Sequence, residues 1–103
     1  MAVIVLTQGD DLVDCNLVLN TDVDLTGYRF VFQLCSFQQE WSGDVVVSKR
    51  LPLNIPASET KKFKTGPCFG YLKRYDKDGL AKTICKNIEF LIEPEVVKND
   101  ARD

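Results

Sequence analysis

Residues 24–34 read Asp24-Leu25-Thr26-Gly27-Tyr28-Arg29-Phe30-Val31-Phe32-Gln33-Leu34. Large apolar side chains recur at every second position from Phe30 to Leu34, which is the two-residue period of a strand that buries one face. Leu25 is the lone apolar residue of the turn before this strand, and we expect its side chain to plug one end of the core. The stretch therefore predicts a turn that leads directly into a core β-strand.

Two turn motifs join strand-like segments near the start of the chain. In the second motif, Asp24 and Thr26 can hydrogen-bond nearby backbone N–H groups, and Gly27 is free to adopt a positive φ. In the first motif, Gly9 and Asp10 follow the apolar run of residues 3–6. We therefore predict that these residues form structural turns between strands.

The rest of the chain favours short strands. Alternating apolar residues predict a half-buried strand over residues 13–19, and Val45-Val46-Val47 predicts a short β-branched strand. A helical turn with Ser58 as its N-cap is expected over residues 57–62. The tetrapeptide Asp76-Lys77-Asp78-Gly79 is a strong hairpin signal. About seven short strands separated by turn signals predict an all-β fold, an antiparallel β-sandwich.

The two turn motifs, in this order and at this spacing, resemble those of the small immunoglobulin-like domains of phage tail and baseplate proteins, such as the N-terminal domain of baseplate upper proteins. In those domains a strand ending in a Gln-Gly-Asp type turn is followed by a core strand, and Asp-Leu-Thr-Gly-aromatic opens the next strand. The similarity continues through Phe69-Gly70-Tyr71-Leu72 to a final strand over residues 88–96. Asn87 and Pro67-Cys68 depart from the family pattern, and these departures affect the strand boundaries more than the fold.

This resemblance implies an immunoglobulin-like β-sandwich that serves as a non-enzymatic virion protein in a tail, a baseplate or a fibre attachment. Its partners would be other virion subunits, including further copies of itself, and it would be found in the virion after assembly in the bacterial host cytoplasm. We expect one sandwich domain over residues 1–96 and a polar C-terminal tail over residues 97–103. Two alternatives stay open: a carbohydrate-binding module for host-surface glycans, and a small phage-encoded inhibitor of a host protein.

The composition is that of an ordinary globular protein. The chain has 103 residues, of which 45% are hydrophobic and 27% are charged. This length can bury a core without metal or disulfide staples. No apolar run approaches the ~20 residues that cross a bilayer, and the N-terminus lacks a basic region followed by a long apolar one. We therefore expect neither membrane insertion nor a secretion signal.

Catalytic machinery is hard to build from these residues. The chain has no histidine, which excludes His-based catalytic and metal sites, and its six glycines form no phosphate-binding loop. Carboxylates pair at Asp10-Asp11 and at Asp22 with Asp24, where they could hold calcium or act as an acid–base pair. Turn residues bonded to the backbone explain the same pattern. We expect no enzyme activity, no metal, no cofactor and no small-molecule ligand.

Four cysteines stand at positions 15, 35, 68 and 85, without a CxxC pair that would suggest structural zinc. Cys15 falls on the inward phase of its expected strand. Pairing Tyr75 with Leu80 across the hairpin would bring Cys85 one diagonal step from Cys68, so Cys68–Cys85 is the disulfide that the hairpin geometry suggests. A reducing bacterial cytoplasm would instead leave the thiols free.

Charge is distributed unevenly along the chain. Residues 1–44 carry seven acidic groups and one basic group, residues 45–86 carry ten basic and three acidic groups, and residues 87–103 carry five acidic and two basic groups. Lysines interleaved with aromatics over residues 61–77 could suggest nucleic-acid binding. The aromatics alternate as core positions would, however, and the pI of about 5.1 opposes a basic footprint. We therefore expect no nucleic-acid partner, and solvated or partner-facing lysines.

Partner contacts are expected on two segments and at two neighbouring lysines. Trp41 lies with Gln38 and Gln39 in a polar segment that we predict to be a loop, where an exposed indole could stack on a sugar or anchor a protein, or could fold back as a lid. The segment between Pro52 and Pro56 suits an edge strand, because proline cannot donate to a ladder. The candidate contact residues are Trp41, Gln38, Gln39, Leu53, Ile55, Lys61 and Lys62.

Overall fold

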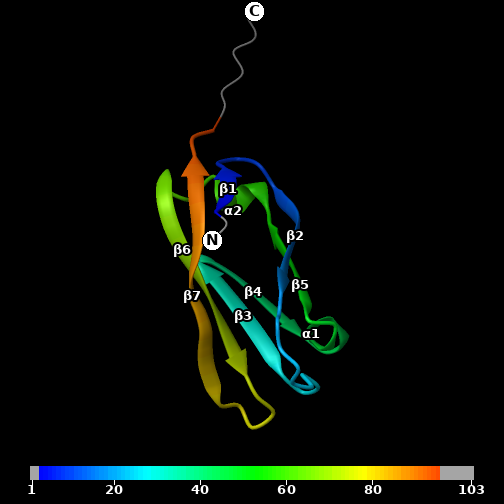
Figure 1. The fold of residues 1–103 in the computed structure, drawn as a ribbon. Coiled ribbons are helices and arrows are strands. Elements are labelled where there is room, and N and C mark those ends of the chain that lie inside the picture. The colour runs from blue at the N-terminus through cyan, green and yellow to red at the C-terminus, as the bar shows by residue number, and fades with distance from the viewer. Residues whose placement is uncertain (1–2, 96–103) are drawn as a thin grey trace, which may run out of the picture.

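Two β-sheets make up most of the computed structural model, which describes residues 3–95 (Figure 1). The described elements are β1 Ile4–Thr7, β2 Leu12–Val18, β3 Arg29–Leu34, β4 Phe37–Ser42, α1 Asp44–Val47, β5 Arg50–Ile55, α2 Ala57–Thr60, β6 Gly66–Tyr75 and β7 Ala81–Glu93. The larger sheet has the order β1-β7-β6-β3-β4, and the smaller sheet pairs β2 with β5. The prediction of an all-β chain with about seven strands is thus confirmed over this range, whereas the polar tail of residues 97–103 lies outside it.

Strand β1 corrects the expectation of a purely antiparallel fold. It runs parallel to β7, with Ile4 opposite Phe90 and Thr7 opposite Glu93, so the five-stranded sheet is mixed. Parallel neighbours in a sheet are joined by a long crossover, and here most of the chain lies between the two strands. No local pattern in a four-residue strand reveals a partner so far away in the sequence.

The core lies between the two sheets. Phe30, Phe32 and Leu34 of β3 are buried, as their alternation predicts. They pack into one cluster with Leu51, Leu53 and Ile55, which point inward from β5 in the smaller sheet. The Phe32 ring has its centre 6.5 Å from that of Phe37 and 5.9 Å from that of Phe90. Leu25 is buried in the same cluster, as expected.

A bulge in β2 shifts the phase that the sequence suggests. The register with β5 slips between Leu12 and Cys15, where Asp14 takes a φ of 58°. The side chain of Val13 is therefore 57% exposed, although the alternation places it inside, and Leu12 packs against the core instead. Cys15 keeps the inward position that we expect, because it lies beyond the bulge.

The strand predicted at residues 45–47 is wrong: these valines form the one-turn helix α1. Gly43 begins the helix at a φ of 71°, and its carbonyl accepts the Val47 N–H at 3.2 Å. Only Val46 is buried. The chain must reverse here between β4 and β5, and this tertiary demand overrides the β-propensity of three valines.

The helical turn predicted at residues 57–62 is present as α2, but Ser58 does not cap it. Pro56 occupies the N-cap position, and no capping side chain belongs to that residue. The first N–H of the helix, from Ala57, is accepted instead by Oδ1 of Asp11 at 2.6 Å. A carboxylate from a segment distant in the sequence thus acts as the N-cap of α2.

The two turn motifs are confirmed as turns. The Thr7 carbonyl accepts the Asp10 N–H at 3.0 Å, and Gly9 has a φ of 85°. Oδ1 of Asp24 accepts the Thr26 hydroxyl at 2.8 Å and the Thr26 N–H at 3.1 Å, and these hydrogen bonds hold the pKa of the Asp24 carboxyl below its ordinary value. Gly27 has a φ of 84°, so both glycines occupy the conformation that the motifs require.

The helices of residues 3–95 are single turns, and none of them is long and apolar enough to cross a membrane.

Candidate functional site

Trp41 lies in strand β4 and not in the loop that the sequence predicts, and of the two alternatives for its indole, exposed or folded back, the structure shows a buried one. Most of the segment predicted as a loop forms β4, and the Trp41 indole is only 6% exposed. Its Nε1 donates a hydrogen bond to the Pro52 carbonyl at 2.9 Å. The indole is thus a core group with one satisfied donor, and it offers no platform on the surface.

The outer edge of β5 is already occupied by side chains of β4. The Gln39 amide donates to the Pro52 carbonyl at 3.1 Å and accepts the Asn54 N–H at 3.0 Å. The Gln39 amide therefore satisfies two backbone groups of β5 that a neighbouring strand would otherwise bond, and it covers this edge of the smaller sheet. The side chains of Leu53 and Ile55 are fully buried, so the expectation that they form a docking edge is wrong. Gln38 remains exposed on the outside of β4.

Lys61 and Lys62 are exposed after α2, as expected of solvated lysines. Lys62 Nζ lies 3.5 Å from a Glu59 carboxylate oxygen, a surface pair of the kind that contributes little to stability. The helix is held from inside by Thr60, whose hydroxyl donates to the Asp10 carbonyl at 2.8 Å and accepts the Gly9 N–H at 3.1 Å. Among the described residues, Lys62 lines a hollow with Phe63, Pro67 and Cys68, and neither Gln38 nor Trp41 is part of its lining.

The four cysteines are free thiols, and the pairing suggested by the hairpin is not supported. Cys68 lies opposite Phe90 and Cys85 lies opposite Leu72, so the two thiols are separated along the ladder. The close neighbour of Cys68 is Cys35, in the turn between β3 and β4. Burial, followed by the charge of Cys35 and a hydrogen bond with it, raises the pKa of the Cys68 thiol to about 11.

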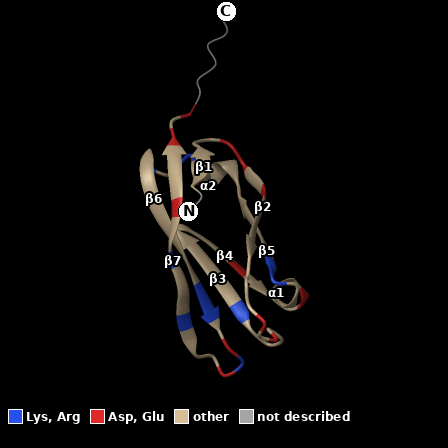
Figure 2. Ribbon diagram, in the orientation of Figure 1, with Lys and Arg blue, Asp and Glu red and all other residues tan. Residues whose placement is uncertain are grey.

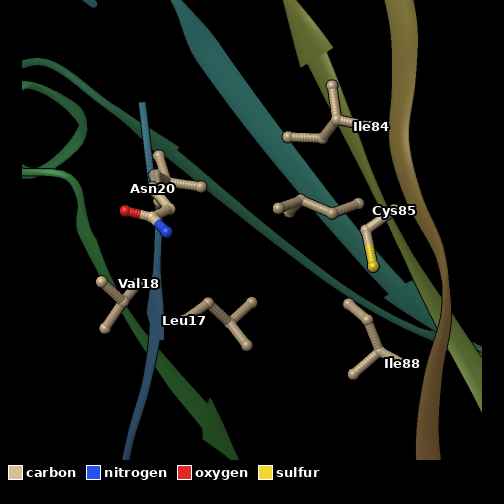
Figure 3. Close-up of a pocket in the computed structure, with 8 residues that line it drawn as sticks. Leu17, Val18, Asn20, Ile84, Cys85 and Ile88 are labelled. Atoms are coloured by element: carbon tan, nitrogen blue, oxygen red, sulfur yellow. The ribbon is translucent and has the colours of Figure 1, made fainter. Parts of the chain in front are cut away.

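The side of the molecule opposite the Gln39 contact is open. Between β2 and the β6–β7 hairpin lies a cleft of about 300 Å³. Figure 3 shows Leu17 on one wall and Ile84, Cys85 and Ile88 of β7 on the other. A second hollow of about 270 Å³ continues from Leu19 and Ile84; it is lined by Leu19, Asn20, Thr21, Leu25, Phe30, Arg74 and Ile84.

Two irregularities in β7 create this lining. Gly70 pairs with Ile88 and Leu72 pairs with Cys85, so three steps on β7 match two on β6. A second extra residue follows, because Lys73 pairs with Thr83. Bulges of this kind turn side chains away from strict alternation. Ile84 and Cys85 therefore both reach the cleft although they are adjacent in sequence.

The same part of β7 has a free backbone edge. Strand β1 pairs only with the end of β7, from Phe90 to Glu93. Over residues 81–89 no strand of the described part lies on that side of β7. A free edge presents alternate N–H and C=O groups to solvent.

The charge around the cleft is mostly positive. Lys73, Arg74, Lys77, Lys82 and Lys86 lie on the β6–β7 hairpin, which appears in Figure 2 as the blue bands of its lower half, with Asp76 and Asp78 at its tip. The Arg74 guanidinium is 5.5 Å from the centre of the Tyr28 ring. Its Nε atom is buried and has no hydrogen-bond partner among residues 3–95.

This arrangement suits binding of apolar side chains more than chemistry. The first hollow is lined mainly by hydrocarbon, whereas the second also presents the polar groups of Asn20, Thr21 and Arg74. Within the described range no three His, Cys, Asp or Glu side chains come together as metal ligands. The sequence reasoning did not identify this site, since the bulges and the missing strand neighbour are tertiary features. The one available signal was the break in alternation from Ile84 to Ile88.

Comparison of the chain with protein-family models, with curated proteins and with solved structures finds no match in any of the three.

Proposed function

We propose that this protein is a non-enzymatic docking module with an immunoglobulin-like β-sandwich fold, acting as a structural subunit of a phage virion in a tail, a baseplate or a fibre attachment. The observation that carries the docking role is the open side, where an apolar cleft runs beside an unpaired stretch of β7. Monomeric proteins rarely leave both an apolar hollow and a sheet edge uncovered at one place. The virion setting rests on the resemblance of the turn motifs.

The two-layer arrangement supports the immunoglobulin-like part of the proposal. Seven strands in the described range form two facing sheets with one core, and both motif glycines have the positive φ that their turns need. The closed side bridged by Gln39 and the open side bounded by β2 and β7 differ sharply in their hydrogen bonding. A partner on the open side would complete the sandwich there.

The alternative of a carbohydrate-binding module is weakened, because the Trp41 ring that would stack on a sugar is buried. Inhibition of a host protein would use the same docking surface, so it differs from the virion role only in the identity of the partner. That identity is what the experiment has to establish.

The test mixes the purified chain with the product of each neighbouring gene, and follows complex formation by size exclusion with light scattering. Hydrogen exchange then reports which amides become protected. We expect a stoichiometric complex with a neighbouring structural protein and protection over residues 81–89. A complex formed only with a host protein would support the inhibitor role and would contradict the virion role.

A matched pair of variants ties the complex to the cleft. Ile84→Lys places a charge in the cleft wall, and Leu91→Lys is the control because it lies on the same strand and is 38% exposed against 40% for Ile84. Leu91 is on the outer face, between the buried Phe90 and Ile92. Loss of the complex with the first variant alone is expected. Equal binding by both variants would show that docking uses another face.

A further inference from the structure

We propose that the partner supplies an extended acidic segment, which adds as a strand to the free edge of β7 and inserts its alternate apolar side chains into the cleft. This inference rests on the docking role proposed above and deepens it by stating the chemistry of the occupant. It combines three observations: the unpaired backbone of residues 81–89, the apolar cleft beside it, and the basic side chains that surround both.

The backbone defines the conformation of the occupant. An edge strand is recognised most directly by another extended segment, whose main-chain groups continue the ladder. The free stretch of β7 covers residues 81–89, where it has a neighbour on the β6 side only. A segment of about nine residues, extending roughly 30 Å, would match this length.

The cleft defines the side chains of the occupant. Successive side chains of a strand point to opposite faces, so every second residue of the added segment would face Leu17, Leu19 and Ile84. The two hollows share Leu19, Asn20 and Ile84 and therefore form one continuous surface. Each has a volume near the lower end of typical ligand pockets, which is about 300–1,000 Å³. Aliphatic residues at alternate positions fit this lining.

The lysines of β7 determine which charge the other side chains of the occupant should carry. They also argue against a second copy of this chain as the occupant. Antiparallel pairing of β7 with its own copy about Ile84 would place Lys82 opposite Lys86, and like charges directly opposite are destabilising. The edge of β2 is a poor substitute, because the bulge at Asp14 interrupts it. An acidic segment would instead place opposite charges beside the exposed Lys82 and Lys86. The occupant is therefore a foreign acidic strand.

The test uses synthetic peptides of about nine residues in which glutamate and valine alternate. Methylation of the peptide nitrogens along one edge prevents the peptide from stacking on itself and leaves the other edge free to pair. Three comparison probes are the same peptide methylated on both edges, a lysine–valine peptide methylated on one edge, and a single-stranded DNA oligonucleotide. Fluorescence anisotropy gives each affinity, and hydrogen exchange locates the protected amides.

We expect the one-edge acidic peptide to bind and to protect residues 81–89. The doubly methylated peptide and the lysine–valine peptide should each bind at least roughly tenfold more weakly, since the first lacks main-chain pairing and the second meets like charge. The double variant Lys82→Glu/Lys86→Glu should lower the affinity for the acidic peptide on the order of tenfold. Both lysines are exposed, so this variant should keep the melting temperature of the wild type.

Four results would overturn the inference: equal affinity for the acidic and basic peptides, equal affinity for the doubly methylated peptide, dimerisation of the chain itself through residues 81–89, or displacement of the acidic peptide by the oligonucleotide. Its failure is distinguishable from that of the proposed function. A neighbouring-gene complex that is sensitive to Ile84→Lys, together with no peptide binding, would reject strand addition but keep the docking role. Peptide binding without any such complex would keep strand addition and reject the virion partner.

Discussion

Gly70 lies on β6 where the Phe32 ring fills the space that a side chain would need. A Cβ atom at Gly70 would be 2.8 Å from Phe32 Cε1, 2.9 Å from Cζ and 3.2 Å from the Gln33 carbonyl oxygen. Phe32 is fully buried, and the main chain of Gln33 belongs to the neighbouring strand β3. Neither neighbour can move without disturbing the core or the ladder. We therefore expect Gly70→Ala to destabilise the fold.

The size of the effect follows from two opposing contributions. Overpacking a well-filled core costs about 1–3 kcal/mol. Replacing glycine by alanine also restricts the unfolded chain, which returns about 0.4–1 kcal/mol. The free energy of unfolding should fall by about 1–2 kcal/mol. For a domain of this length the melting temperature should fall by roughly 5–10 °C.

Thermal and urea unfolding of three variants would check this reasoning. Phe69→Ala is the control on the same strand, since Phe69 is 55% exposed, and it should change the free energy of unfolding by less than about 0.5 kcal/mol. Phe32→Leu removes the ring atoms that meet the new Cβ. The cost of Gly70→Ala should therefore be smaller in the Phe32→Leu background than in the wild type. Equal costs in both backgrounds, or an unchanged melting temperature for Gly70→Ala alone, would refute the steric argument.

Three further outcomes are expected. Gly27→Val should lower the free energy of unfolding by at least about 1 kcal/mol in a melt, because a β-branched residue is strained at a φ of 84°; an unchanged melt would remove the turn assignment. Oxidation by glutathione disulfide, which is reduced to two glutathione molecules, should form a disulfide between Cys35 and Cys68 and none between Cys68 and Cys85. Peptide mapping by mass spectrometry that finds a Cys68–Cys85 disulfide would contradict the structure. Because hydrogen bonds lower the pKa of Asp24 in the fold, its carboxylate stabilises the protein above the ordinary value of 3.8, and this contribution is lost as pH falls through the lowered value. Asp24→Ala should thus be less stable than the wild type at pH 7 and equal to it in strong acid, by urea unfolding at each pH; a difference independent of pH would reject this linkage.

Local sequence patterns predict the structure correctly wherever a segment determines its own conformation. The alternation from Phe30 to Leu34 predicts a core strand, and the glycines of both turn motifs predict a positive φ. The hairpin between β6 and β7 is likewise confirmed, with Oδ1 of Asp76 accepting the N–H groups of Asp78 and Leu80. In each of these cases hydrogen bonds or burial reinforce the intrinsic preference of the residues.

Predictions failed where distant segments decide the outcome. Trp41 belongs to a strand whose face toward β5 includes the polar Gln39, and the half-buried Gln39 amide is accommodated there because β5 offers it two backbone partners. The phase of β2 depends on one bulge, and the parallel pairing of β1 depends on a strand near the other end of the chain. The cleft depends on the bulges of β7 and on the short pairing with β1, which leaves residues 81–89 without a strand on one side. A sequence pattern read segment by segment carries none of this information.

The parallel pairing of β1 with β7 determines how the molecule would respond to a mechanical load. A force that pulls backwards on the start of β1 and forwards on the end of β7 acts along both strands in opposite directions. The ladder from Ile4 opposite Phe90 to Thr7 opposite Glu93, extended by the hydrogen bond from Gln8 N to the Glu93 carbonyl at 3.0 Å, would then be loaded in shear. Its bonds would share the tension and would have to break together, whereas a hairpin pulled from its open end yields one bond at a time.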